Sequence, residues 1–227
     1  AENLRRENVE GGIWVTGNTV IDALRYTASG EGFSRPELSD IDYVNHRVVT
    51  LTCHRRENYG KPMRNIFEAV RNTALRFPDV IFVYPVHRSP VVREAAGELL
   101  SGVANIKLIE PLDAVDMHRL MARSYMVMTD SGGIQEEAPA LRKPALVLRR
   151  ETERPEAVDA GTVALAGTDR ENIEKLAAEL LTDKAAYDKM ARAVNPYGDG
   201  HACPRIADAI CYAFGLSERR PEEFKPQ

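Results

Sequence analysis

Residues 125–141 read Tyr-Met-Val-Met-Thr-Asp-Ser-Gly-Gly-Ile-Gln-Glu-Glu-Ala-Pro-Ala-Leu, so that an apolar strand-like run passes into a helix-like run through two glycines. Glycines let a backbone approach an anion closely, and the free amides at a helix start carry about half a positive charge. Two interpretations of residues 129–137 stay open. The turn is either a phosphate-binding loop or an ordinary tight turn whose helix is capped by Ser131.

The same alternation of strand-like and helix-like runs extends along the chain in both directions. The expected strands are Ile13–Thr16, Arg47–Cys53, Val80–Tyr84, Ile106–Ile109, Tyr125–Thr129 and Ala145–Leu148, and the expected helices are Asn18–Tyr26, 62–75, Val91–Leu100, Asp113–Ala122, Gly133–Leu141, Glu171–Leu181, Ala185–Val194 and Pro204–Phe214. Apolar strands separated by amphipathic helices are what a parallel sheet covered on both faces requires. The sequence therefore predicts a doubly wound, Rossmann-like α/β fold, with a strand order that it does not reveal.

Composition excludes several classes of protein. The 227 residues can bury a large α/β core. A net charge of -4 and a pI near 5.8 do not indicate a nucleic-acid-binding protein. The chain has no apolar run of about 20 residues and no secretory signal pattern, so we expect a cytoplasmic protein without membrane contacts. Its three cysteines, Cys53, Cys203 and Cys211, form no CxxC pair and predict free thiols.

The first residues, Ala1–Asn8, are polar and helix-forming and include no initiator Met. We interpret residues 1–11 as the end of a helix from a preceding domain that is missing here. Residues 12–214 are then the Rossmann-like domain. Residues 215–227 form a polar tail that is expected to fray.

A second candidate site is the loop at residues 52–60, which contains His54, Arg55 and Arg56. In open α/β sheets ligands bind outside the carboxyl ends of the strands, and this loop follows a predicted strand. We expect the two arginines to keep His54 neutral until an anionic ligand arrives, when protonation becomes favourable. Such a histidine suits a departing phosphate, although a lone loop histidine is often only solvated or bonded to backbone.

Two further loops follow predicted strands. In residues 148–156 acids and bases interleave, and Pro155 is expected to restrict Arg154 to an extended backbone. The alternative is a salt-bridged surface loop, and the cationic pair Arg149 and Arg150 is open to the same interpretation. His87, in residues 84–90, is expected at the same rim of the sheet.

Taken together, six segments resemble the non-hydrolysing UDP-N-acetylglucosamine 2-epimerases. They are Gly17–Asp22, His54–Glu57, Tyr84–His87, Thr129–Pro139, Thr152–Glu156 and Asn195–Gly200, in the order and spacing of that family. The resemblance implies two Rossmann-like domains facing a cleft, in the glycosyltransferase-B arrangement. This sequence resembles the second, UDP-binding domain.

The resemblance also implies roles for individual residues. The catalytic residue His54 would bind the diphosphate together with Ser131, Gly132 and Gly133. Glu137 would bind the ribose, Arg154 would contact the nucleotide in the closed state, and Met117 stands where the family often has an aromatic residue near the uracil. Arg55 and His87 match positions that help bacterial members to bind a second, regulatory UDP-N-acetylglucosamine.

The reaction implied by the resemblance is inversion at sugar carbon 2, by elimination of UDP to a 2-acetamidoglucal and re-addition. The acids and bases at carbon 2 would be carboxylates of the missing N-terminal domain, so the chain alone is expected to be inactive, and the longer protein to be a homodimer. Neither a metal-ligand spacing nor a nicotinamide fingerprint occurs, so we expect no metal and no cofactor. Alternatives are a UDP-sugar glycosyltransferase, a hydrolysing epimerase and a catalytically silent UDP-binding domain.

Overall fold

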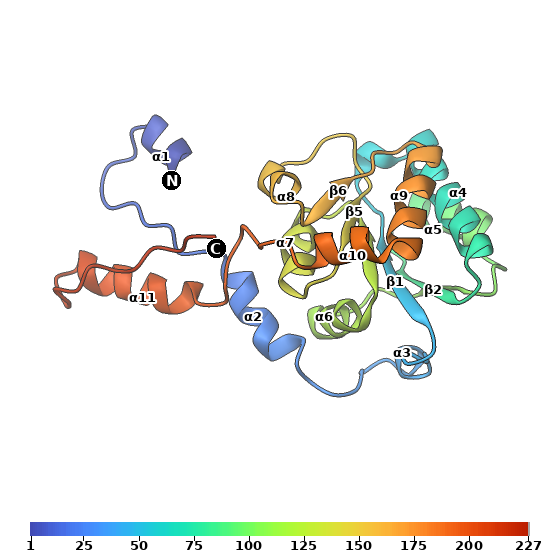
Figure 1. Cartoon of the computed structure of the whole chain (residues 1–227), viewed down its shortest axis with the longest axis horizontal. Helices are drawn as coiled ribbons and strands as arrows, with labels where there is room; N and C mark the ends of the chain where they lie inside the picture. The colour runs from blue at the N-terminus through green and yellow to red at the C-terminus, as the bar shows by residue number, and fades with distance from the viewer. Residues whose placement is uncertain (227) are drawn as a thin grey trace.

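A single parallel sheet with the strand order β3-β2-β1-β4-β5-β6 organises the computed structural model, which describes residues 1–226 (Figure 1). The strands are β1 (Arg47–Thr52), β2 (Val80–Pro85), β3 (Ile106–Ile109), β4 (Met126–Thr129), β5 (Ala145–Val147) and β6 (Val163–Leu165), and every neighbouring pair is parallel. The chain builds outward from β1 to β3 and then restarts beside β1 with β4. This order confirms the predicted doubly wound sheet and places its topological switch point between β1 and β4.

Helices cover both faces of the sheet. One face carries α4 (Lys61–Arg76), α5 (Pro90–Leu100), α9 (Arg170–Thr182) and α10 (Lys184–Ala191), and the other carries α3 (Pro36–Ser39), α6 (Ala114–Arg123), α7 (Gly132–Ala140) and α8 (Pro155–Asp159). Successive strand residues point to opposite faces: Val49 and Leu51 pack with α4, whereas Val48 packs with the α6 side. Because both faces are covered, the strands are mostly apolar, as the sequence indicated.

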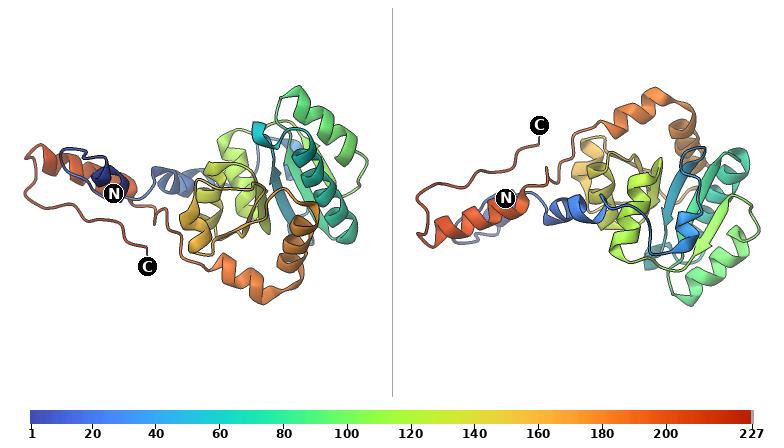
Figure 2. Two further views of the ribbon diagram at one scale, coloured as in Figure 1. Left: turned by 90° about the horizontal axis from the view of Figure 1, so that it is seen from above. Right: turned by 90° about the horizontal axis from the view of Figure 1, so that it is seen from below.

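A smaller part of the chain projects away from the sheet (Figure 2). It contains α1 (Glu2–Arg6), α11 (Ala202–Ala213) and residues 214–226, and α2 (Thr19–Thr27) joins it to the sheet by packing against α6 and α7. The buried carboxylate of Asp22 accepts hydrogen bonds from the N–H groups of Ala202, at 3.0 Å, and Cys203, at 2.8 Å. Asp22 thus fixes the start of α11 to α2.

The prediction of a strand at Ile13–Thr16 is wrong. This segment is extended but pairs with no strand, and its Val15 carbonyl accepts one hydrogen bond from the N–H of Phe224, at 2.7 Å. Phe224 is buried, so the polar tail, which was expected to fray, packs against the rest of the chain at this residue. The three-residue strand β6 and the five-residue helix α8 were not predicted.

Most other predicted elements are present within a few residues of their expected ends. Gly60, with φ 79°, turns the chain between the 3-10 helix η1 (Arg56–Asn58) and α4, and Pro62 lies in the first turn of α4. Within residues 1–226 we find no helix with the length and apolar character needed to cross a bilayer.

Candidate functional site

The loop that carries His54 and the turn that carries Ser131 leave the sheet side by side. Thr52, the last residue of β1, pairs with Thr129, the last residue of β4, and their hydroxyl oxygens are 2.6 Å apart. The two segments therefore start at the switch point, where the diverging connections of a doubly wound sheet leave a crevice. The structure confirms that both lie at one rim of the sheet.

Asp130 joins these two segments. Its carboxylate is fully buried, and Oδ2 accepts hydrogen bonds from the backbone N–H groups of His54 (2.8 Å) and Arg55 (2.7 Å) and from Nδ2 of Asn58 (3.1 Å). The other oxygen, Oδ1, has no hydrogen-bond partner within residues 1–226 and lies 3.6 Å from Nδ1 of His54. Asp130 could not be singled out from the sequence, because an acidic residue after a strand carries no local sign of burial.

The imidazole of His54 is partly buried, and burial is the main reason why its pKa lies below the ordinary value. Asp130 acts in the opposite direction, while His87 and Arg55 add to the lowering. A lowered pKa favours the neutral state that was expected, but the cause assigned from the sequence was incomplete. Desolvation contributes more than the neighbouring cations, and Arg56 is not among the causes.

The start of α7 leaves its backbone amides available. Ser131 is the N-cap residue, but its hydroxyl makes no capping hydrogen bond, and its own N–H donates to Oγ1 of Thr129 at 2.9 Å. The first N–H groups of a helix, here those of Gly132 and Gly133, have no acceptor within the helix. This turn is therefore not the side-chain-capped turn of the alternative interpretation, and its helix starts three residues after the end of β4.

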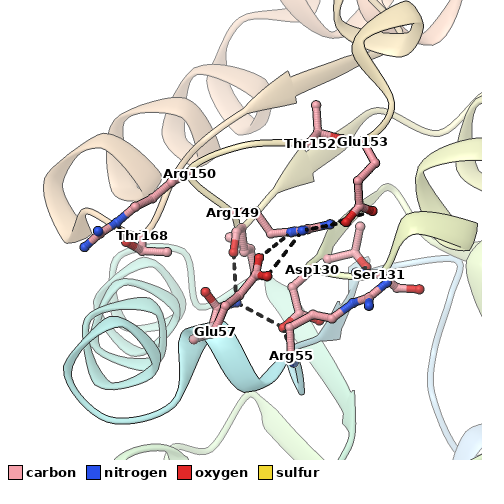
Figure 3. Close-up of polar contacts among 12 residues, drawn as sticks. Arg55, Glu57, Asp130, Ser131, Arg149, Arg150, Thr152, Glu153 and Thr168 are labelled. Atoms are coloured by element: carbon pink, nitrogen blue, oxygen red, sulfur yellow. Dashed lines mark hydrogen bonds and ion pairs between the residues drawn. The ribbon is translucent and has the colours of Figure 1, made fainter.

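Arg55 lies along this turn, as Figure 3 shows. A methyl group added at Gly132 would be 3.7 Å from Nη2 of Arg55. The ring of His87 lies beside that of His54, with the two centroids 5.3 Å apart, and its Nδ1 accepts a hydrogen bond from the N–H of Ser89 at 3.1 Å. The rim therefore gathers one guanidinium, two imidazoles and a set of helix amides.

Glu137 folds back along α7 toward the same turn. A methyl group at Gly133 would lie 3.6 Å from Oε1 of Glu137, and the other oxygen, Oε2, lies 3.5 Å from Nε2 of His118. Nδ1 of His118 is in turn 2.7 Å from Oγ1 of Thr27. His118 and Thr27 were not predicted, since neither belongs to a recognisable motif. The adjacent Met117 is half-buried and packs against the apolar cluster around α7.

Arg154 is held by an acidic partner from α7. Its Nε pairs with Oε1 of Glu136, whose other oxygen accepts a hydrogen bond from Nδ2 of Asn18. The bond to Glu136 is the main reason why the pKa of Arg154 is raised. The backbone of Arg154 has φ -125° and ψ 57°, so the expected fully extended geometry is wrong, and Pro155 begins α8 instead.

The geometry matches a known family. A family model described as UDP-N-acetylglucosamine 2-epimerase matches residues 1–211. The chain belongs to the UDP-N-acetylglucosamine 2-epimerase family. A curated family member, the UDP-N-acetylglucosamine 2-epimerase of Bacillus subtilis, is 50% identical over 224 residues, which cover 98% of this chain and 58% of that protein. The chain thus spans less than two thirds of the length of this relative.

Solved structures of the epimerase family have the same fold. The S. aureus MnaA-UDP co-structure has a TM-score of 0.90 and 46% identity, covering 98% of this chain and 60% of that chain. UDP-GlcNAc 2-epimerase from Neisseria meningitidis bound to UDP-GlcNAc has a TM-score of 0.84 and 42% identity, covering 92% and 58%. A likeness in fold alone extends to WaaG, a glycosyltransferase involved in lipopolysaccharide biosynthesis, with a TM-score of 0.57 and 17% identity over 82% and 53%.

The six segments that resemble the epimerase family occupy two places in the structure. Four of them, His54–Glu57, Tyr84–His87, Thr129–Pro139 and Thr152–Glu156, reach the rim described above. The other two, Gly17–Asp22 and Asn195–Gly200, pack against each other, and the N–H of Asn18 donates to the carbonyl of Tyr197 at 2.7 Å. Asn18 also reaches Glu136, so this second group of segments is tied to the rim through α7.

Proposed function

We propose that this chain is the UDP-binding half of a non-hydrolysing UDP-N-acetylglucosamine 2-epimerase. The observation that carries the proposal is the buried Asp130 carboxylate, which joins the loop of His54 to the helix turn of Ser131 at the switch point. Free helix amides, a guanidinium and a histidine at one rim are a suitable environment for a diphosphate. The related structures from S. aureus, solved with UDP, and from Neisseria meningitidis, bound to UDP-GlcNAc, support the choice of ligand.

In this proposal each part of the nucleotide has its own contacts. The diphosphate binds to His54, to the hydroxyl of Ser131 and to the amides of Gly132 and Gly133. The ribose hydroxyls bind to Glu137, because a carboxylate one turn along the helix accepts hydrogen bonds without facing the phosphates. The uracil lies near Met117, and Arg154 contacts the nucleotide when the cleft closes.

The proposed reaction begins with removal of the proton from carbon 2 of the sugar and cleavage of the bond between carbon 1 and the diphosphate oxygen. The bonding electron pair leaves with UDP, and a 2-acetamidoglucal remains. Re-addition of UDP to carbon 1 and of a proton to the opposite face of carbon 2 gives UDP-N-acetylmannosamine. Since no carbonyl acidifies carbon 2, donors that stabilise the departing diphosphate contribute strongly, and His54 and the Ser131 turn are suited to this role.

We further propose that the acid and base for carbon 2 lie in the part of the relatives that this chain does not span. Residues 12–214 would then form the UDP-binding unit of a longer, homodimeric and cytoplasmic enzyme, with residues 1–11 joining the other half and Arg55 and His87 contributing to a regulatory site. The 227-residue chain should show no epimerase turnover. Appreciable turnover by the purified chain would contradict this assignment of the acid and base.

Titration calorimetry with UDP tests the binding site. The unaltered chain should bind UDP, and His54→Ala should weaken binding by roughly 10- to 150-fold, because a charge-assisted contact contributes about 1.5–3 kcal/mol. His46→Ala is the matched control, since His46 lies before β1, at the opposite end of the strand. Equal UDP affinity of the two variants would remove His54 from the site.

Product analysis of the longer protein distinguishes the three enzymatic alternatives. Incubation with UDP-N-acetylglucosamine should give UDP-N-acetylmannosamine, with the nucleotide still attached to the sugar. Free N-acetylmannosamine with free UDP would indicate a hydrolysing epimerase. A glycoside formed only with an acceptor would indicate a glycosyltransferase.

A further inference from the structure

Arg149 is a buried cation that the proposed function does not use. It follows β5, is 6% exposed, and lies between the loop after β1 and the loop before α8 (Figure 3). Its Nε is 2.6 Å from Oε1 of Glu57, and its Nη2 is 3.1 Å from Oε1 of Glu153. Arg149 is therefore salt-bridged, as in the alternative interpretation, but it is buried and does not lie on a solvated surface. One guanidinium pairs with two carboxylates from two different loops.

Glu153 brings a negative charge close to the proposed diphosphate site. Its Oε2 would be 3.9 Å from a methyl group at Gly132, on the same turn that Arg55 approaches. The hydrogen bonds from Arg149 hold the pKa of Glu153 below its ordinary value, and Arg55 lowers it further, so the carboxylate is ionised. An ionised carboxylate at this position repels a diphosphate unless a cation balances its charge.

The loop that carries His54 is tied to the same arginine. Glu57 lies in η1, three residues after His54, and the adjacent Asn58 donates through Nδ2 to Oδ2 of Asp130 and to the carbonyl of Leu148, both at 3.1 Å. The backbone around His54 is thus fixed on one side by Asp130 and on the other by the segment that begins at Leu148. Arg149, the residue after Leu148, pairs with the carboxylates of Glu57 and Glu153.

We propose that Arg149 is a positioning residue for nucleotide binding, which neutralises Glu57 and Glu153 and holds Glu153 in place, so that a nucleoside diphosphate can occupy the turn beside Gly132. Arg149 acts through these two carboxylates and does not itself touch the ligand. The inference rests on the proposed UDP site. According to the inference, the UDP affinity of this site depends on the positive charge of Arg149, which lies outside the site.

Arg149→Met tests the inference, because the methionine side chain keeps apolar bulk and removes the charge. Glu57 and Glu153 are about half exposed, so solvent can hydrate them and the variant should remain folded. UDP affinity measured by calorimetry should fall about tenfold or more. Adding Glu153→Gln to this variant should restore most of the affinity. The matched control is Arg150→Met, since Arg150 is the exposed neighbour, pairs with no carboxylate within residues 1–226, and should leave UDP affinity unchanged.

Every result of these UDP-binding measurements either supports or contradicts the role proposed for Arg149. Weaker binding that Glu153→Gln does not restore would indicate a purely structural arginine and overturn the proposal, as would unchanged binding by Arg149→Met. If thermal melting shows that Arg149→Met is unfolded, the single variant Glu153→Gln decides. Glu153→Gln should bind UDP more tightly, especially at low salt, because an unbalanced cation then remains near the ligand. Equal or weaker binding by Glu153→Gln would overturn the inference.

The same measurements separate the inference from the proposed function. If the unaltered chain binds no UDP, the proposed function fails together with the inference. If UDP binding is sensitive to His54→Ala but not to Arg149→Met, only the inference fails.

Discussion

The carboxylate of Asp130 holds the backbone of His54 in place and also faces its side chain. Oδ2 accepts a hydrogen bond from the N–H of His54 at 2.8 Å, and Oδ1, which has no other partner within residues 1–226, lies 3.6 Å from Nδ1 of the imidazole. A buried carboxylate in this position stabilises the positive charge of a protonated histidine on the Nδ1 side and leaves Nε2–H to donate to a ligand. The pair is therefore arranged for a histidine that gains a proton when an anion binds.

Asp130→Ala should reduce both stability and UDP affinity. Three donors, from His54, Arg55 and Asn58, lose their shared buried acceptor, so the free energy of unfolding should fall by about 3 kcal/mol or more in urea titrations. UDP affinity, measured below the melting temperature, should fall as well. Asp183→Ala is the control, because it removes an exposed cap of α10 and should cost about 1 kcal/mol without changing UDP affinity. An Asp130→Ala protein with unchanged UDP affinity would show that the carboxylate does not organise the site.

The pH dependence of UDP binding should report the state of His54. Its pKa in the free protein is lowered, and a bound diphosphate should raise it, so binding takes up a proton. The contribution of His54 to UDP affinity is then fully present below the pKa of His54 in the free protein. It is lost as pH rises through the pKa of His54 in the complex. Calorimetry over about pH 5 to 8 should show this loss in the unaltered chain and not in His54→Asn. The phosphate of UDP titrates in the same way with both proteins. Identical pH profiles of UDP affinity would therefore contradict the assignment of His54 to the diphosphate.

Gly132→Ala should separate binding from folding. Gly132 has no positive φ, and an added methyl group meets only ordinary contacts, at 3.7 Å from Arg55 and 3.9 Å from Glu153, so stability should be unchanged or slightly higher. The methyl group would, however, stand where the diphosphate is proposed to bind, and UDP affinity should fall about tenfold. Gly97→Ala, inside α5 with nothing within 4 Å of the added methyl group, should raise stability by about 0.5–1 kcal/mol and leave binding unchanged. Full UDP affinity in Gly132→Ala would place the diphosphate elsewhere.

Glu137→Ala should weaken the binding of the ribose and leave the binding of the phosphates unchanged. The variant should weaken UDP binding about tenfold, because two hydroxyls lose their acceptor, while inorganic pyrophosphate should bind as before. Glu94→Ala, on the exposed side of α5, is the control for the change in charge. Competition calorimetry with both ligands checks this prediction. Equal loss for UDP and pyrophosphate would mean that Glu137 acts on the phosphate site or on the fold.

Short and isolated elements limited the prediction of the fold. The expected helix Val91–Leu100 is observed as Pro90–Leu100, because eleven residues contain enough apolar repeats to define a helix face. β6 has three residues, Val163–Leu165, and was missed, although the equally short β5 was predicted. Ile13–Thr16 has the composition of a strand but finds no neighbouring strand, and a strand exists only through pairing with another segment.

The sequence by itself determined the fold class, the His54 loop and the Ser131 turn, because strand and helix periodicity and glycine turn chemistry are local properties of a few adjacent residues. Only the tertiary structure decided that β1 and β4 are neighbours, that Asp130 is buried beneath His54, and that Arg149 pairs with Glu57 and Glu153. Residues 54 and 130 are 76 positions apart, and Arg149 and Glu57 are 92 apart. Such contacts follow from the packing of the whole sheet, which fixes the burial and the partner of each charge and which no local pattern encodes.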